Sequence, residues 1–217
     1  ANDNKTVFYV KQHPETLLPY QVYRHQLGSD ISADVLIYEE LDDTFYVDIY
    51  KTRSEQYLVI CIDSTTTSEC LVLDADKPMD EFVSFLPRSR DHEYSIDHFQ
   101  GRFYIRTNHS GKNFALQTTT RLQNSSSEEW TSIIEARDHV LLEGYELMRD
   151  WLIVEERQAG LPILRQINHQ TGENKILTFN DPIYTVFSHY NPDPNSNKFR
   201  YQYTSFTTPS TVYELDL

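Results

Sequence analysis

Three carboxylates occupy the same place in three successive segments of this sequence. They are Asp48, Asp97 and Glu143, and each lies three residues after the large apolar or aromatic residue that opens its segment. Phe187 takes this place in a fourth segment. Carboxylates gathered on neighbouring strands would focus negative potential on a cationic ligand. The alternative is that they are simply polar residues where strands meet water, and the pattern leaves both interpretations open.

The positions of the glycines exclude several catalytic loops. There are six, and no two of them are four residues apart: Gly28, Gly101, Gly111, Gly144, Gly160 and Gly172. The sequence therefore contains no G-x-S-x-G, no G-x-G-x-x-G and no phosphate-binding P-loop. It also contains no C-x-x-C and no H-E-x-x-H motif. We expect neither an active site of these types nor a cofactor.

Two patterns suggest a metal site, and both are weak. His92 and His98 are the closest pair of histidines, but a metal usually needs more ligands than two. The run from Asp193 to Asn197 matches the first half of a calcium-binding loop, D-x-N-x-N. Lys198 replaces the glycine of that loop, and Thr204 replaces its closing glutamate. We therefore expect a solvated hairpin loop and no metal.

The segment from Phe45 to Asp76 indicates the scaffold that positions the carboxylates. It reads as three short strands, Phe45–Lys51, Tyr57–Asp63 and Ser68–Asp74, with polar turns between them. The middle strand is apolar almost without a break from Leu58 to Ile62, as in a strand that is buried on both faces.

This strand pattern is repeated along the chain. The middle-strand residues Tyr57, Phe103, Trp151 and Phe199 are 46, 48 and 48 residues apart. The expected strands of the later copies are Tyr94–Asp97, Arg102–Arg106 and Asn113–Gln117, then Val140–Glu143, Asp150–Glu155 and Pro162–Gln166, then Tyr184–Phe187, Phe199–Tyr203 and Thr211–Leu215. A fourth strand closes most copies, at Glu81–Pro87, Trp130–Ile134 and Lys175–Phe179. Repeats of roughly 40–50 residues with four strands each are typical of β-propeller blades.

We therefore predict an all-β fold, an incomplete β-propeller with about five blades' worth of four-stranded antiparallel sheets. An antiparallel sandwich is the alternative, but it would not keep one strand order four times. The first strand of a propeller blade lies nearest the central channel, so the three carboxylates would line the channel wall. The predicted division is the end of one blade at 1–40, full blades at 44–88, 93–135 and 139–180, and an incomplete last blade at 183–217. We expect the chain to be a piece of something larger.

Charge and cysteine content limit the partners. The formal net charge of −14 argues against nucleic acid, because phosphate binding needs a basic face. No apolar run is long enough to span a membrane, and the first residues lack a signal-peptide pattern.

If Thr65 and Thr66 form a two-residue turn, Cys61 lies opposite Cys70, close enough for a disulfide on distance alone. A pair of buried thiols in a reducing compartment is the favoured interpretation.

Several long stretches of the sequence resemble the propeller of the oligopeptidase B (protease II) branch of the prolyl-oligopeptidase family of serine peptidases. The resemblance covers essentially the whole chain, and its most specific words are Lys51–Ser54, Thr66–Glu69, Leu73–Asp76, Asp91–His98, Gly111–Phe114, Asp150–Arg157 and Thr207–Asp216. It implies a cytoplasmic peptidase that cleaves short peptides after Arg or Lys. It also implies a seven-bladed propeller that caps an α/β-hydrolase domain and screens substrates by size.

The resemblance implies that the catalytic residues lie outside this chain. The serine nucleophile, its His and Asp, and the acidic residues that select a basic side chain belong to the hydrolase domain, which would be the main partner of this segment. The segment alone is therefore expected to be inactive. Two other functions stay open: a stand-alone propeller that binds proteins, and a propeller glycosidase that uses two of Asp48, Asp97 and Glu143.

Overall fold

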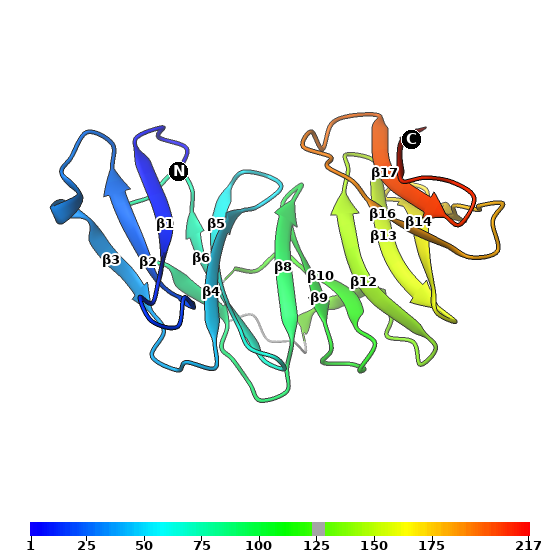
Figure 1. Ribbon diagram of the computed structural model, residues 1–217. Helices are drawn as coiled ribbons and strands as arrows, with labels where there is room; N and C mark the ends of the chain where they lie inside the picture. The colour runs from blue at the N-terminus through cyan, green and yellow to red at the C-terminus, as the bar shows by residue number, and fades with distance from the viewer. Residues whose placement is uncertain (123–128) are drawn as a thin grey trace. The chain divides into compact units, whose positions relative to one another are not determined.

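The computed structural model describes residues 1–122 and 129–217, and β-strands dominate it. The strands form five antiparallel sheets, which we call A to E, and in each sheet they lie in chain order (Figure 1). Sheet A contains β1 (Thr6–Gln12), β2 (Pro19–Gln26) and β3 (Val35–Glu39), and sheet B contains β4 (Tyr46–Lys51), β5 (Tyr57–Asp63), β6 (Ser68–Asp74) and β7 (Val83–Leu86). Sheet C contains β8 (Tyr94–Phe99), β9 (Arg102–Thr107), β10 (Ala115–Thr119) and β11 (Thr131–Ile134). Sheet D contains β12 (Val140–Leu147), β13 (Trp151–Gln158), β14 (Leu161–Asn168) and β15 (Asn174–Ile176), and sheet E contains β16 (Tyr184–Ser188), β17 (Lys198–Ser205) and β18 (Thr211–Asp216). A short 3-10 helix, η1 (Ile31–Ala33), precedes β3.

The all-β prediction and the repeated strand order are confirmed. Strands β5 and β6 begin and end at the predicted residues, because a β-branched apolar run forms the first and a tight turn fixes the second. Strand β10 begins two residues later than predicted, at Ala115. Phe114 has a φ of 63° and its N–H donates to Gly111 O at 3.0 Å, so a turn occupies the predicted start of this strand.

The chain divides into two compact units, and each has its own core. The first unit contains residues 1–109 and 117–133, and the second contains residues 110–116 and 134–217. In the first unit, Val59 and Val72 of sheet B pack with Ile96, Phe103 and Ile105 of sheet C, all of them almost fully buried. Burying one such side chain stabilises a fold by about 1.5–3 kcal/mol.

In the second unit, the core lies between sheets D and E. Ile153 and Leu164 of sheet D pack with Val186, Phe199 and Tyr203 of sheet E. Phe199 is the middle-strand residue of the last copy, and it is completely buried. The repeat that was visible in the sequence is therefore a repeat of core positions.

One packing rule holds within both units. The third strand of a four-stranded sheet contacts the first strand of the next sheet, as β6 contacts β8 in the first unit and β14 contacts β16 in the second. Strand β2 contacts β4 in the same way. By this rule β1, β2 and β3 correspond to the second, third and fourth strands of the other sheets.

Candidate functional site

Asp48 lies on β4, the first strand of sheet B, and its side chain is exposed. Its Oδ1 accepts a hydrogen bond from the N–H of Ile49 at 2.8 Å. Cys61 is its cross-strand partner on β5. Burial raises the pKa of nearby Asp63, and the charge of Asp48 raises it further. Asp48 therefore presents an exposed negative charge.

Asp97 occupies the same place on β8, but it is used differently. Its Oδ1 accepts hydrogen bonds from the N–H of Arg53 and from the N–H of His98, both at 2.7 Å. Arg53 lies in the turn between β4 and β5, so this carboxylate ties sheet C to sheet B. Burial raises the pKa of Asp97, although the two hydrogen bonds and the charge of Arg53 oppose the shift.

His98 extends this connection between sheets B and C. Its Nδ1 lies 2.8 Å from Ser54 Oγ in a hydrogen bond, and its backbone O accepts the Ser54 N–H at 2.8 Å. Its ring centroid lies 4.8 Å from that of Tyr57 and 4.7 Å from that of Phe103. Burial lowers the pKa of His98. The carboxylate of Asp97 binds backbone N–H groups, so the Ser54–His98 pair fits packing between sheets better than nucleophilic catalysis.

The metal interpretation of His92 and His98 gains no support from the described residues. His92 is also buried, and its Nε2 lies 2.8 Å from Thr107 Oγ1 in a hydrogen bond. Among residues 1–122 and 129–217, no group of three or more His, Cys, Asp and Glu side chains could hold a metal ion. In the predicted solvated loop, Asp193 Oδ1 accepts the N–H of Asn195 at 2.9 Å.

Glu143, the third predicted carboxylate, belongs to the second unit. It lies on β12, where the pairing with β13 is shifted by a bulge between Leu142 and Gly144. Its carboxylate accepts two hydrogen bonds from Arg157, from Nε at 2.6 Å and from Nη2 at 3.2 Å. The guanidinium therefore compensates its charge. Phe187, which takes the corresponding place on β16, is exposed.

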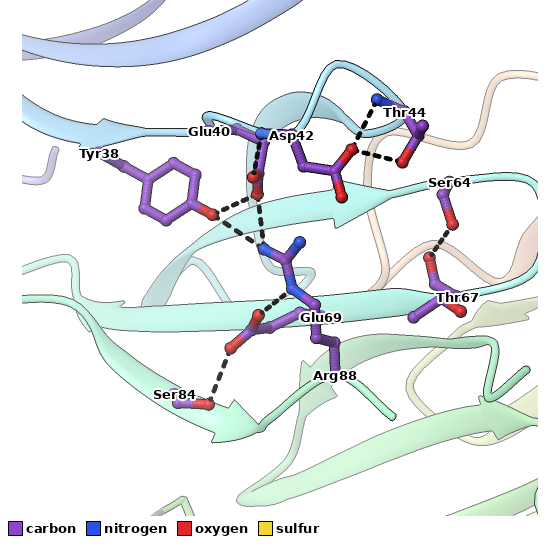
Figure 2. Close-up of polar contacts among 9 residues, drawn as sticks. All are labelled: Tyr38, Glu40, Asp42, Thr44, Ser64, Thr67, Glu69, Ser84 and Arg88. Atoms are coloured by element: carbon purple, nitrogen blue, oxygen red, sulfur yellow. Dashed lines mark hydrogen bonds and ion pairs between the residues drawn. The ribbon is translucent and has the colours of Figure 1, made fainter. Parts of the chain in front are cut away.

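A clasp that the sequence did not reveal is centred on Arg88, just after β7. Figure 2 shows its guanidinium between the carboxylates of Glu40 and Glu69, at 2.5 Å and 2.8 Å. The same group donates to Tyr38 Oη at 3.1 Å and lies 4.2 Å above the ring centroid of Phe45. Tyr38 lies on β3 of sheet A, Glu40 comes directly after this strand, and Glu69 lies on β6 of sheet B. The clasp therefore joins two neighbouring sheets.

The electrostatics of the clasp favour its charged form. Burial alone would raise the pKa of Glu40, but hydrogen bonds from Arg88, from the N–H of Asp42 and from Tyr38 outweigh it, and the pKa is lowered. Burial opposes the charge on Arg88 too, yet the two carboxylates raise its pKa. Long-range partners of this kind leave no local pattern in a sequence.

A second ionic cluster, also missed, lies inside the second unit. Glu156 on β13 is 1% exposed and lies between Arg137 and Arg165. Arg165 donates to Glu156 Oε2 from Nε at 3.0 Å and from Nη2 at 2.8 Å, and Arg137 donates to Oε1. The only feature of the sequence that could have indicated this cluster is a glutamate within the middle strand of a repeat.

Asp97, His98 and Arg88 therefore join neighbouring sheets, whereas the ion pairs of Glu143 and Glu156 lie within sheet D. Among the three predicted carboxylates, only Asp48 is exposed and has no ion pair with a described residue. Of the predicted carboxylates, Asp48 and Asp97 lie in one unit and contact different partners. No helix in the described residues is long and apolar enough to cross a membrane.

Comparison with known proteins identifies the family to which this architecture belongs. All of residues 1–217 match the family model described as prolyl oligopeptidase, N-terminal beta-propeller domain. The chain is 37% identical to dipeptidyl aminopeptidase BI of Pseudoxanthomonas mexicana, a match that covers 100% of the chain and 30% of that protein. It is 32% identical to protease 2 of Moraxella lacunata, over 97% of the chain and 30% of that protein.

A solved structure is also similar to this chain. Oligopeptidase B from Leishmania major superposes with a TM-score of 0.89 at 25% identity, over 98% of this chain and 31% of that one. The chain thus spans about a third of the length of the proteins that it matches, and the resemblance seen in the sequence is confirmed at the level of the family. Residues 1–217 belong to the N-terminal β-propeller domain family of the prolyl oligopeptidases and form part of such a propeller.

Proposed function

We propose that residues 1–217 are the non-catalytic, substrate-gating part of a serine oligopeptidase that cleaves short peptides after Arg or Lys. The family match over the whole chain carries this proposal. The likeness to protease 2 and to oligopeptidase B supports the choice of enzyme. An α/β-hydrolase domain in the same protein would supply the nucleophile, and the rigid sheets would exclude folded proteins by size.

The charge of the chain supports a basic substrate. A net charge of −14 attracts cationic peptides, and the exposed carboxylate of Asp48 would add to the local potential. We keep Asp48, Asp97 and Glu143 as proposed channel residues. Asp48 should contribute most, because Glu143 is paired with Arg157 and Asp97 binds two N–H groups.

A second candidate is a dipeptidyl aminopeptidase activity, which the name of the 37% identical relative suggests. Such an enzyme would need a free amino terminus two residues before the scissile bond. An oligopeptidase would instead accept a peptide whose amino terminus is blocked. The two candidates share the propeller and differ in the substrate that they accept.

The test is a comparison of peptides with the full-length protein that contains this chain. Blocked peptides that end in Arg or Lys before a chromogenic amide should be cleaved, and matched peptides with Gln in that place should not. Cleavage restricted to unblocked dipeptides would favour the second candidate. Cleavage of a folded protein as fast as of a short peptide would overturn the gating proposal, and the isolated chain should cleave none of these substrates.

The proposed channel residues have their own test. In the full-length protein, Asp48→Asn should lower kcat/KM for Arg peptides several-fold, and Glu143→Gln should lower it less. The effect should shrink at high salt, because a field between exposed charges is screened. If the combined Asp48→Asn, Asp97→Asn and Glu143→Gln variant keeps the wild-type kcat/KM, the acidic-wall hypothesis is wrong.

A further inference from the structure

Cys61 and Cys70 face each other across the β5–β6 hairpin of sheet B. They are cross-strand partners in the register of these strands, as the Thr65–Thr66 turn predicted, and both thiols are free. The hairpin is closed by a hydrogen bond from Ser64 N–H to Thr67 O at 2.8 Å. Because hydrogen-bonded and non-hydrogen-bonded pairs alternate from there, the cysteines form a non-hydrogen-bonded pair.

The backbone at Cys70 supports this assignment. Its N–H donates to Tyr94 Oη at 2.8 Å, on sheet C, and so points away from β5. In a non-hydrogen-bonded pair the Cα atoms are roughly 4.5 Å apart, and the side chains are closer than in the other type of pair. That separation lies within the range in which disulfides form without backbone movement.

The two thiols are in contact, but they differ in access to solvent. Cys70 is 1% exposed and belongs to the core between sheets B and C, whereas Cys61 is half-buried at its margin. A hydrogen bond with Cys61, and then burial, raise the pKa of the Cys70 thiol well above its usual value. On the other side of Cys61 lies its partner on β4, the exposed Asp48. A reagent that arrives from the β4 side therefore meets Cys61 first, beside a negative charge.

We propose that Cys61 and Cys70 are a reversible modification site, which a small cationic or neutral disulfide converts into a cross-strand disulfide bond. The Cys61 thiol gives its proton to solvent, and the thiolate attacks the reagent R–S–S–R to form a mixed disulfide. The R–S⁻ that leaves takes up a proton and becomes the first R–SH. The Cys70 thiol then gives up its proton to solvent and attacks the Cys61 sulfur, which releases the second R–SH. Two protein thiols are oxidised and one disulfide reagent is reduced to two thiols, and an excess of dithiol reverses both steps.

The geometry predicts the order and the rates of these steps. Cys61 reacts first because it is accessible, and Cys70 resolves the mixed disulfide because it is already in contact. The second step is slow at neutral pH, since few Cys70 thiols are ionised, and it accelerates as the pH rises. Asp48 favours a cationic reagent over an anionic one.

The experiment treats the folded full-length protein that contains this chain with cystamine, which is cationic, or with oxidised glutathione, which is anionic. Peptide mass mapping after alkylation of free thiols should show Cys61 and Cys70 unalkylated and together two hydrogens lighter, and dithiothreitol should restore both thiols. Cystamine should act several-fold faster than glutathione, and Asp48→Asn should reduce this ratio. The melting temperature of the oxidised chain should rise, because the cross-link restricts the unfolded chain.

Two variants separate the steps. Cys70→Ser should stop at the mixed disulfide on Cys61, and Cys61→Ser should stay unmodified until the chain is unfolded in urea. The proposal is overturned if the folded wild-type chain also stops at the mixed disulfide. It is equally overturned if a disulfide forms only between two chains, as a non-reducing gel would show, or only after unfolding.

Discussion

The N–H of Arg53 donates to Oδ1 of Asp97 at 2.7 Å, so that a side chain of sheet C holds a turn of sheet B. The same oxygen also accepts the N–H of His98. Replacing Asp97 by Ala would leave two backbone donors without their partner, and each loss costs about 1–3 kcal/mol where water cannot replace it. We therefore expect Asp97→Ala to lower the free energy of unfolding by roughly 2–4 kcal/mol in urea titrations.

Asp97→Asn is the matched control, because an amide oxygen can accept both hydrogen bonds. It should be several-fold less costly than Asp97→Ala at neutral pH. If the two variants unfold at the same urea concentration, the carboxylate oxygen does not hold the turn, and another property of residue 97 controls stability.

The contributions of Asp97 and His98 to the stability of the fold should change with pH in opposite directions, although the two residues are adjacent. Burial raises the pKa of Asp97 above 3.8, so the folded chain binds this proton more tightly than the unfolded chain. Its contribution to stability is complete below 3.8 and is lost as the pH rises through the raised pKa. Burial lowers the pKa of His98 below 6.5, so its contribution is complete above 6.5 and is lost as the pH falls through the lowered pKa.

The slopes can be measured by urea unfolding between about pH 7 and about pH 4. His98→Phe should lose less stability on acidification than the wild type, and Asp97→Asn should lose more. Any constant cost of either substitution cancels in the slope. Parallel curves for the wild type and both variants would contradict the assignment of these two groups.

The clasp around Arg88 should be worth far more than a surface ion pair. Arg88→Met keeps the apolar stem but leaves Glu40 and Glu69, whose side chains are 8% and 15% exposed, without their cation. Truncating one member of such a network typically costs about 2–5 kcal/mol. Arg88→Lys should lower the free energy of unfolding by less than Arg88→Met does. It should still destabilise the fold, since an ammonium cannot reproduce the two-sided fork of the guanidinium.

Arg90 provides the control two residues further on. Its side chain is 95% exposed and lies 3.6 Å from Asp91, in a pair that solvent screens. Arg90→Met should change the free energy of unfolding by less than about 0.5 kcal/mol. Equal losses for Arg88→Met and Arg90→Met would show that the junction of sheets A and B does not depend on the clasp.

The sequence predicted what depends on neighbouring residues, and it failed where partners are distant. Strands β5 and β6 and the pairing of Cys61 with Cys70 follow from an apolar run and a two-residue turn. The shared place of Asp48, Asp97 and Glu143 in the repeat was also visible. Their different partners were not, because these depend on how one sheet packs on the next.

The Arg88 clasp illustrates the same limit. Arg88 and Glu40 are 48 residues apart, and no periodic signal connects them. In sequence, Glu156 looks like the solvated end of a strand between two other charged residues. It is buried only because Arg137 and Arg165 reach it from either side. Burial of a charge is a property of the assembled sheet, and composition does not reveal it.

Glu156 gives the last prediction, since a buried carboxylate between two guanidiniums should resist replacement. Glu156→Gln keeps the shape but removes the charge that Arg137 and Arg165 share, and we expect a loss of about 3–5 kcal/mol. Glu143→Gln breaks the more exposed pair with Arg157 in the same sheet, and it should cost only about 0.2–1 kcal/mol. Combining Glu156→Gln with Arg165→Met should cost less than the sum of the single changes, because either change alone already breaks the ion pair between the two residues. Simple additivity in urea unfolding would mean that Glu156 stabilises sheet D by its packing and not by its charge.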